Sequence, residues 1–233
     1  MNLNEYKDIL TALSDTGYCF VDFHTARPEQ KHIILRHDID MDIAAALEMA
    51  ELEHSLSIKS TYYVLLTSSL YNAFTAENVA LLKQIGNLGH NVDLHFDASI
   101  YPGDSDTLDQ EARKECARLE GLTGRTVNSI SFHRPAQEFL NNPHKLADRI
   151  HSYQPRYFSE MGYCSDSRGE WRHGHPLDHE ALKQGTALQL LTHPIWWVFE
   201  GSSPQEKLNR LVAGRHAEYK EQLALNCLSY TPD

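Results

Sequence analysis

Two kinds of apolar segment alternate along the chain. Five segments carry apolar side chains at helical spacing: 3–14, 41–56, 77–89, 107–124 and 204–228. Six others are short apolar runs of the kind found in strands: 18–23, 32–37, 60–66, 92–96, 129–132 and 188–193. We also expect a helix over 144–153. Alternation of this kind is typical of βα units and therefore predicts an α/β protein built on a parallel sheet.

Four of the apolar runs end in residues that can bind a metal or transfer a proton. These residues are Asp38 and Asp40, then His95 and Asp97, then His133, and lastly His193. The carboxyl ends of parallel strands lie on one side of a sheet, where α/β proteins build their active sites. The pattern therefore predicts one shared site, and we interpret the chain as a metal-dependent hydrolase.

Asp38 and Asp40 are two residues apart, so on an extended chain both side chains point to the same face. Two neighbouring carboxylates repel each other unless a cation or a proton lies between them. One could bind a metal while the other accepts a proton from water. The alternative is that Asp40 or Asp42 caps the helix that begins near Ile43.

The histidine segments offer further ligands. His95 lies at a strand exit and could bind a metal, and Asp97 could be a ligand or could fix the imidazole tautomer. His133 offers another nitrogen, and Arg134 could neutralise or orient a carboxylate. A buried structural role is the alternative for any one of these histidines, because the chain contains 14 of them.

Residues 154–180 form the least regular part of the sequence, and we interpret them as a loop that faces the substrate. Asp166, Arg168 and Trp171 would hold a sugar there through hydroxyl recognition and ring stacking. The alternative is a surface loop with an Arg–Asp ion pair. Trp196 could line a carbohydrate pocket, although adjacent tryptophans usually pack in the core.

Length and composition narrow the class of protein. The 233 residues contain no linker, repeat or low-complexity tract, so we expect a single domain over residues 1–233. A formal net charge of −11 argues against a nucleic-acid partner. No apolar run approaches the roughly 18 residues of a membrane span, and the amino terminus lacks a signal-peptide pattern. Four scattered cysteines predict reduced thiols and a cytoplasmic protein.

Five segments resemble motifs of the polysaccharide deacetylase superfamily, which is carbohydrate esterase family 4. They are Arg36–Asp40, Leu88–Asp97, Ser131–Pro135, Ser165–Trp171 and Leu190–Trp197. The resemblance is closest to uncharacterised bacterial members linked to surface-polysaccharide synthesis, and it covers roughly residues 30–200. It implies a distorted (β/α) barrel of about seven parallel strands that uses a divalent metal to hydrolyse an N-acetyl group on a sugar.

The first motif of the family implies a catalytic base at Asp38 and a metal ligand at Asp40. Its arginine–proline motif corresponds to Arg134 and Pro135, and its general-acid histidine corresponds to His193.

The second motif of the family has two ligand histidines four residues apart, and here the chain departs from it. His95 matches the first histidine, but Ser99 stands in the second position. We expect His133 to supply the third ligand, with Asp97 as the second choice.

Taken together, the sequence predicts a metal-dependent amide hydrolase that removes an N-acetyl group from a sugar or a surface-polysaccharide precursor. The substrate would be a small molecule or an oligosaccharide. Carboxylate and imidazole ligands suit Zn²⁺, and Co²⁺, Ni²⁺ or Mn²⁺ would also fit. Two alternatives stay open: a catalytically silent barrel that binds carbohydrate, and a C–N hydrolase that acts on a non-carbohydrate amide.

Overall fold

The strands of the chain form one parallel sheet. The computed structural model describes residues 1–172 and 174–232. The strands are β1 (Cys19–Phe20), β2 (His32–Ile39), β3 (Thr61–Val64), β4 (Asn91–Phe96), β5 (Ser129–Phe132), β6 (Ile150–His151), β7 (Gly162–Ser165) and β8 (Leu188–Thr192). Seven of them follow the order β6-β5-β4-β3-β2-β8-β7, and β1 pairs with the start of β2. Every pairing is parallel.

The sheet is curled into an open, distorted barrel whose edge strands are β6 and β7. Gln189 of β8 spans the open side, because its Nε2 donates to the backbone carbonyls of Ser152 at 3.1 Å and Tyr157 at 2.7 Å. The predicted fold class, a distorted (β/α) barrel of about seven parallel strands, is confirmed.

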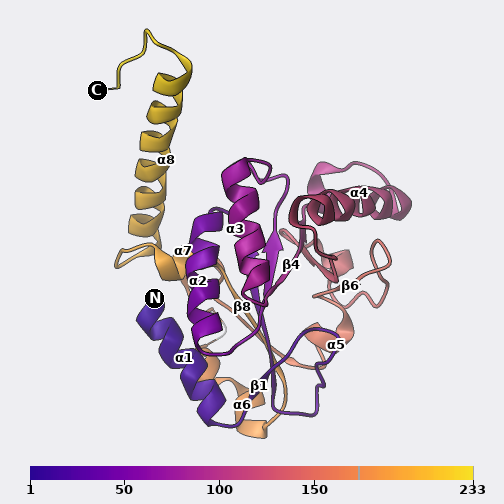
Figure 1. Cartoon of the computed structure of the whole chain (residues 1–233). Coiled ribbons are helices and arrows are strands. Elements are labelled where there is room, and N and C mark those ends of the chain that lie inside the picture. The colour runs from indigo at the N-terminus through magenta and orange to yellow at the C-terminus, as the bar shows by residue number, and fades with distance from the viewer. Residues whose placement is uncertain (173, 233) are drawn as a thin grey trace.

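Helices cover the outer face of the sheet (Figure 1). They are α1 (Leu3–Asp15), α2 (Ile43–Ser55), α3 (Ala76–Asn87), α4 (Ser105–Thr123), α5 (Pro155–Phe158), α6 (Glu180–Gln184), α7 (Pro194–Val198) and α8 (Pro204–Asn226). Helix α1 buries Tyr6, Ile9, Leu10 and Leu13, which lie on one helical stripe. Helices α2 and α3 pack side by side.

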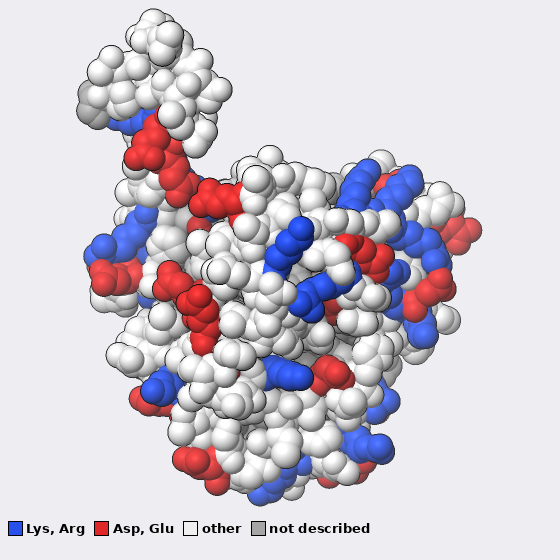
Figure 2. Space-filling model, in the orientation of Figure 1, with Lys and Arg blue, Asp and Glu red and all other residues white. Residues whose placement is uncertain are grey.

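Helix α8 differs from the others because its C-terminal half extends away from the body of the molecule (Figure 1). Only Lys207 and Leu211 of this helix are buried. None of the helices within the described ranges combines the length and apolar character needed to cross a bilayer. On the face drawn in Figure 2, acidic and basic side chains are interspersed rather than separated by sign.

The helix predicted over 144–153 is wrong. This stretch contains a tight turn and the short strand β6 instead. Ala147 and Asp148 have positive φ values of 51° and 62°, which a helix does not allow. Long-range bonds hold the turn, because Ala147 N donates to Asp109 Oδ1 at 2.6 Å and Arg149 Nε donates to Val127 O at 2.8 Å. Tertiary contacts therefore override the local pattern.

The segment 154–180 is also more regular than a loop. It contains helix α5 and strand β7, which pairs with β8 inside the sheet. His173, which belongs to this predicted substrate segment, lies outside the described residues. The four cysteines, Cys19, Cys116, Cys164 and Cys227, are free thiols in the structure.

Candidate active site

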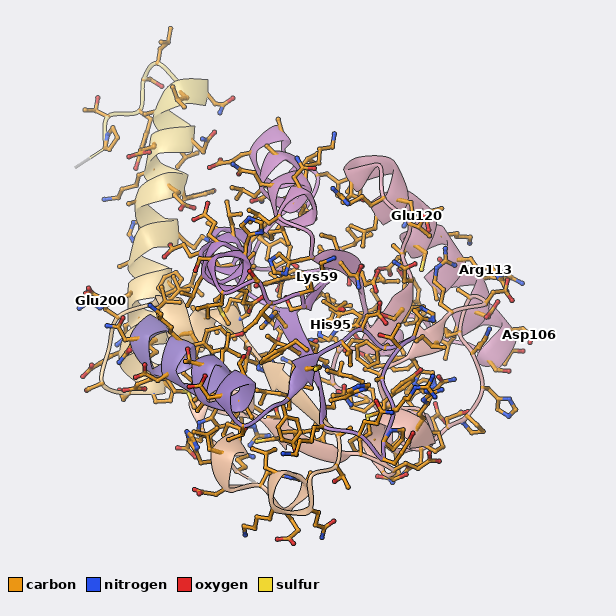
Figure 3. The ribbon with its side chains drawn as sticks, turned by 60° about the horizontal axis from the view of Figure 1, so that its bottom comes forward. Lys59, His95, Asp106, Arg113, Glu120 and Glu200 are labelled. Carbon is orange, nitrogen blue, oxygen red and sulfur yellow. The ribbon has the colours of Figure 1, made fainter. Side chains whose placement is uncertain are left out.

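A cavity of about 650 Å³ lies at the carboxyl ends of the strands. Nine of the eleven residues predicted for the site line it: Asp38, Asp40, His95, Asp97, His133, Arg134, Arg168, His193 and Trp196. The other two, Asp166 and Trp171, are not among its lining residues. Figure 3 shows His95 near the centre of the molecule, far from surface residues such as Arg113 and Glu200.

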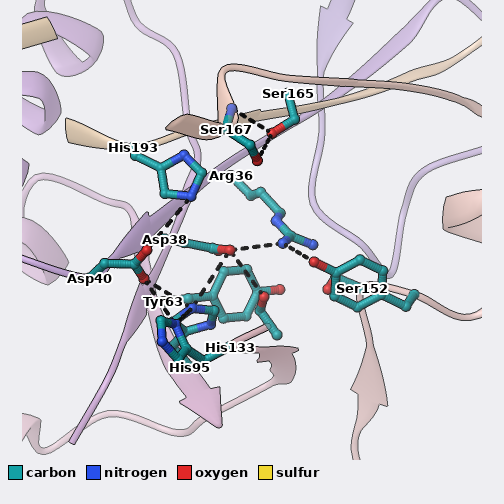
Figure 4. Close-up of polar contacts among 12 residues, drawn as sticks. Arg36, Asp38, Asp40, Tyr63, His95, His133, Ser152, Ser165, Ser167 and His193 are labelled. Atoms are coloured by element: carbon teal, nitrogen blue, oxygen red, sulfur yellow. Dashed lines mark hydrogen bonds and ion pairs between the residues drawn. The ribbon is translucent and has the colours of Figure 1, made fainter. Parts of the chain in front are cut away.

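Three of the lining residues form a group that could hold a metal ion: Asp40, His95 and His133 (Figure 4). Asp40 Oδ1 lies 3.1 Å from His95 Nε2 and 3.5 Å from His133 Nδ1, and the two nitrogens are 3.3 Å apart. Ligands of a tetrahedral zinc site, with bonds of about 2.0–2.1 Å, lie about 3.3 Å from one another. The three atoms therefore have the spacing of one face of such a site.

The charges within this group favour a cation as well. Asp40 Oδ1 is buried, and ring nitrogens of His95 and His133 lie 3.1 Å and 3.5 Å from it. Burial opposes ionisation of Asp40, but His133 and His95 outweigh it and hold its pKa well below the usual value. The hydrogen bond to Asp40 in turn raises the pKa of His133. A divalent cation would take the place of the protons that these groups otherwise share, so the residues present fit a metal.

Local structure explains why the side chain of Asp40 is available to bind a metal. Asp42, not Asp40, caps α2, since its side chain accepts from Ala45 N at 2.8 Å. The other candidate ligand, Asp97, is engaged elsewhere, because its Oδ1 accepts from Ser99 N at 3.0 Å and from Ser99 Oγ at 2.5 Å. Asp97 lines the cavity but is not part of the group of three.

Asp38 is held by a residue that the sequence reasoning missed. Arg36 is fully buried, and its Nη2 donates to Asp38 Oδ2 at 2.9 Å. Ser131 Oγ lies 3.4 Å from the same oxygen. Asp38 Oδ1, in contrast, is buried without a hydrogen-bond partner among the described residues. Asp38 therefore offers one unpaired carboxylate oxygen at the cavity.

Arg36 is itself fixed from two other strand ends. Its Nη1 donates to Gln189 Oε1 at 3.0 Å, and its Nη2 donates to Tyr153 Oη at 3.1 Å. The sequence suggests Arg134 as the residue that could orient a carboxylate, but the contact to Asp38 is made by Arg36. The signal in the sequence was an arginine inside the apolar run 32–37, two residues before Asp38 and on the same face.

His193 is held by Asp166, which lies directly after β7. The carboxylate of Asp166 is fully buried and accepts from His193 Nδ1 at 2.6 Å, from His193 N at 3.0 Å and from Trp197 Nε1 at 2.7 Å. The carboxylate of Asp166, which we predicted to contact substrate, is occupied by these three bonds. Because Nδ1 is engaged, His193 directs Nε2 to the cavity, 3.8 Å from Asp40 Oδ2.

The same contacts set the protonation of His193. Burial lowers its pKa, but the charge of Asp166 and its hydrogen bond, with Asp40 and Asp38 beyond, outweigh burial and raise the pKa to about 9. An imidazole with this pKa carries a proton at neutral pH.

The two tryptophans of the predicted substrate set have different surroundings. Trp196 lines the cavity although it is only 4% exposed. Trp171 packs against Trp197, with ring centroids 5.8 Å apart, and against His175. Trp196 therefore lies at the wall of the cavity, whereas Trp171 is not among the lining residues.

No protein-family model and no curated protein matches the chain. Solved structures similar to it include a family 4 carbohydrate esterase from Bacillus anthracis, 13% identical, with a TM-score of 0.47 over 90% of this chain and 86% of that one. An acetyl xylan esterase from Clostridium thermocellum, in complex with a cobalt ion, is 13% identical, with a TM-score of 0.42 over 83% and 90%. A pseudoenzyme from Bacillus anthracis is 15% identical, with a TM-score of 0.43 over 82% and 63%.

The first two are family 4 esterases, and the third is a pseudoenzyme of carbohydrate esterase family 4. This is the family that the sequence motifs resemble. The chain spans less than two thirds of the length of the pseudoenzyme chain.

Proposed function

We propose that the chain is a metal-dependent amide hydrolase that removes an N-acetyl group from a sugar or a surface-polysaccharide precursor. One observation carries the proposal. Three ligand atoms at the spacing of a metal site lie beside a carboxylate with an unpaired oxygen and a histidine that is held in its charged form.

Asp40, His95 and His133 would hold the metal. Two imidazoles and one carboxylate suit Zn²⁺ best, and Co²⁺, Ni²⁺ or Mn²⁺ would fit the same donors. A bound divalent ion would act as a Lewis acid toward the acetyl carbonyl.

The other residues supply the proton transfers. Arg36 fixes Asp38 Oδ2, which leaves Oδ1 to accept a proton from the attacking water. An amine is a poor leaving group as an anion, so cleavage of the C–N bond requires a proton at the nitrogen. His193 would give that proton from Nε2, while Asp166 stabilises the charged imidazole. The products are acetate and the free amino sugar.

A catalytically silent barrel that binds carbohydrate is the second candidate, and Ser99 in the position of the family's second histidine favours it. A C–N hydrolase that acts on a non-carbohydrate amide would use the same site. The two enzyme functions act on different substrates, whereas the silent barrel binds carbohydrate without hydrolysing it.

Metal content tests the site separately from catalysis. We expect the purified chain, loaded with zinc and passed through a desalting column, to retain one ion, as measured by elemental analysis. The variants Asp40→Ala, His95→Ala and His133→Ala should each lose it, whereas Asp97→Ala, the matched control, should keep it. If Asp97→Ala loses zinc while His133→Ala retains it, the third ligand is Asp97 and not His133.

Acetate release tests the reaction. The zinc-loaded chain should release acetate from N-acetyl sugars, and His193→Ala should retain zinc while losing about 10²–10⁴ in kcat. A chain that binds zinc but releases acetate from neither N-acetyl sugars nor simple acetamides would support the silent barrel.

A further inference from the structure

Two arginines at the cavity have no hydrogen-bond or ion-pair partner among the described residues. Arg134 and Arg168 both line it, and both side chains are exposed. Neither guanidinium makes a hydrogen bond or an ion pair with any residue in the described part of the chain. They come from different loops, one after β5 and one after β7. Two positive charges are thus presented to the cavity from separate segments.

Neither arginine forms an ion pair with a carboxylate of the site among the described residues. Asp38 is paired with Arg36, Asp40 with the two histidines, and Asp97 with Ser99. Each carboxylate that lines the cavity therefore has a contact that involves neither Arg134 nor Arg168. The two guanidinium groups thus lack direct pairing among the described residues, in a chain with 32 acidic and 21 basic residues.

The backbone at both arginines is strained in the same way. Arg134 has φ 50° and Arg168 has φ 64°, in the left-handed region that side chains with a Cβ avoid at a cost of about 1–2 kcal/mol. Residues held in this conformation concentrate at binding sites. Beside Arg168, a Cβ on Gly169 would lie 2.8 Å from Pro204 and 3.3 Å from Trp196, so the loop is packed closely against its surroundings.

We propose that Arg134 and Arg168 bind a phosphoryl group carried by the substrate, so that the chain acts on a phosphorylated or nucleotide-linked N-acetyl sugar. This inference rests on the proposed function and names its substrate class. A phosphate monoester carries about two negative charges at neutral pH, which matches two unpaired guanidinium groups. Guanidinium donates to phosphate oxygens in a planar, two-pronged geometry. A cavity of about 650 Å³ is large enough for a ligand of this size.

Binding to the metal-free chain tests the inference without requiring turnover, and it avoids direct contact between phosphate and a metal. Calorimetry would compare N-acetylglucosamine, its 1-phosphate, and its uridine diphosphate conjugate, each with EDTA-treated protein. We expect both phosphorylated probes to bind at least ten times more tightly than the plain sugar. Their affinity should also fall as salt increases, because exposed charges are screened.

The variant Arg134→Gln/Arg168→Gln should bind all three probes with equal affinity, while Arg210→Gln on α8 is the matched control and should behave as the wild type. Equal binding of both phosphorylated probes would show that the phosphoryl group suffices. Tighter binding of the conjugate would identify a nucleotide-linked sugar.

The inference is overturned if the wild type does not distinguish the plain sugar from its phosphate, or if the double variant keeps the preference. A failure of the proposed function looks different. In that case the phosphorylated probes bind as expected, but the zinc-loaded chain releases no acetate from any of them.

Discussion

The bond between Asp166 and His193 gives a quantitative prediction for the variant Asp166→Asn. Asp166 is buried, and its charge and its 2.6 Å hydrogen bond oppose the desolvation of His193 and raise the pKa of that histidine from 6.5 to about 9. The difference corresponds to roughly 3 kcal/mol of extra stability for the charged imidazole. A neutral amide at position 166 removes the largest part of this effect.

The sign of the effect on folding follows from the two pKa values. His193 has a higher pKa in the folded chain than in the unfolded chain, so folding favours the protonated form. Its contribution to stability is complete below pH 6.5 and is lost as the pH rises through about 9. The advantage of the wild type over Asp166→Asn should therefore be largest near pH 6 and should shrink by up to roughly 3 kcal/mol by pH 9.5.

Urea unfolding of the metal-free chain at several pH values between 6 and 9.5 measures this difference. Asp8→Asn, an exposed aspartate on α1, is the matched control and should run parallel to the wild type. If the gap between the wild type and Asp166→Asn stays constant over this range, Asp166 does not hold the charge of His193, and the assignment of His193 as general acid loses its support.

Two further substitutions test the framework of the site. Arg36→Met removes one partner of a buried ion pair and should lower the free energy of unfolding, measured in urea, by about 3–5 kcal/mol. Arg36→Lys should recover part of this loss. A loss below about 1 kcal/mol in Arg36→Met would contradict the role given to the pair with Asp38. Gly162→Ala places a Cβ 2.7 Å from Ala181 Cβ and should cost about 1–3 kcal/mol in thermal unfolding. Gly121→Ala meets open space inside α4 and should instead stabilise by about 0.5–1 kcal/mol, so a loss in both variants would show that packing at Gly162 is not the cause.

The part of the site that could be predicted depends on local sequence and on topology. Each apolar run fixes where a strand ends, and parallel pairing then brings those ends to one side of the sheet. This reasoning brings Asp40, His95 and His133 to one site, although 55 and 38 residues separate consecutive members of the group. The choice of Asp40 rather than Asp38 as the ligand came from the family resemblance.

The part that could not be predicted depends on side-chain direction and on long-range packing. Strand β7 has only four residues and lacks a distinctive pattern, so Asp166 was not recognised as the residue after a strand. Its bond to His193 joins two β-strand ends that are 27 residues apart. The direction of the carboxylate is set by Trp197 and by the backbone of His193, neither of which the sequence around Asp166 reveals.

In our proposal, the sheet supplies the third ligand from a different strand than the one that precedes Ser99. In the register of β4 and β5, His95 lies level with Ser131, so His133 continues the same face one pleat further along the neighbouring strand. His133 N donates to Phe96 O at 2.8 Å, which extends the ladder to this residue and fixes where its imidazole begins. Ser99 meanwhile donates two hydrogen bonds to Asp97 Oδ1, and Asp97 is not part of the group. In our proposal, the third ligand is therefore provided across the sheet by β5, and the serine that stands in the usual histidine position contributes by keeping a competing carboxylate out of the metal site.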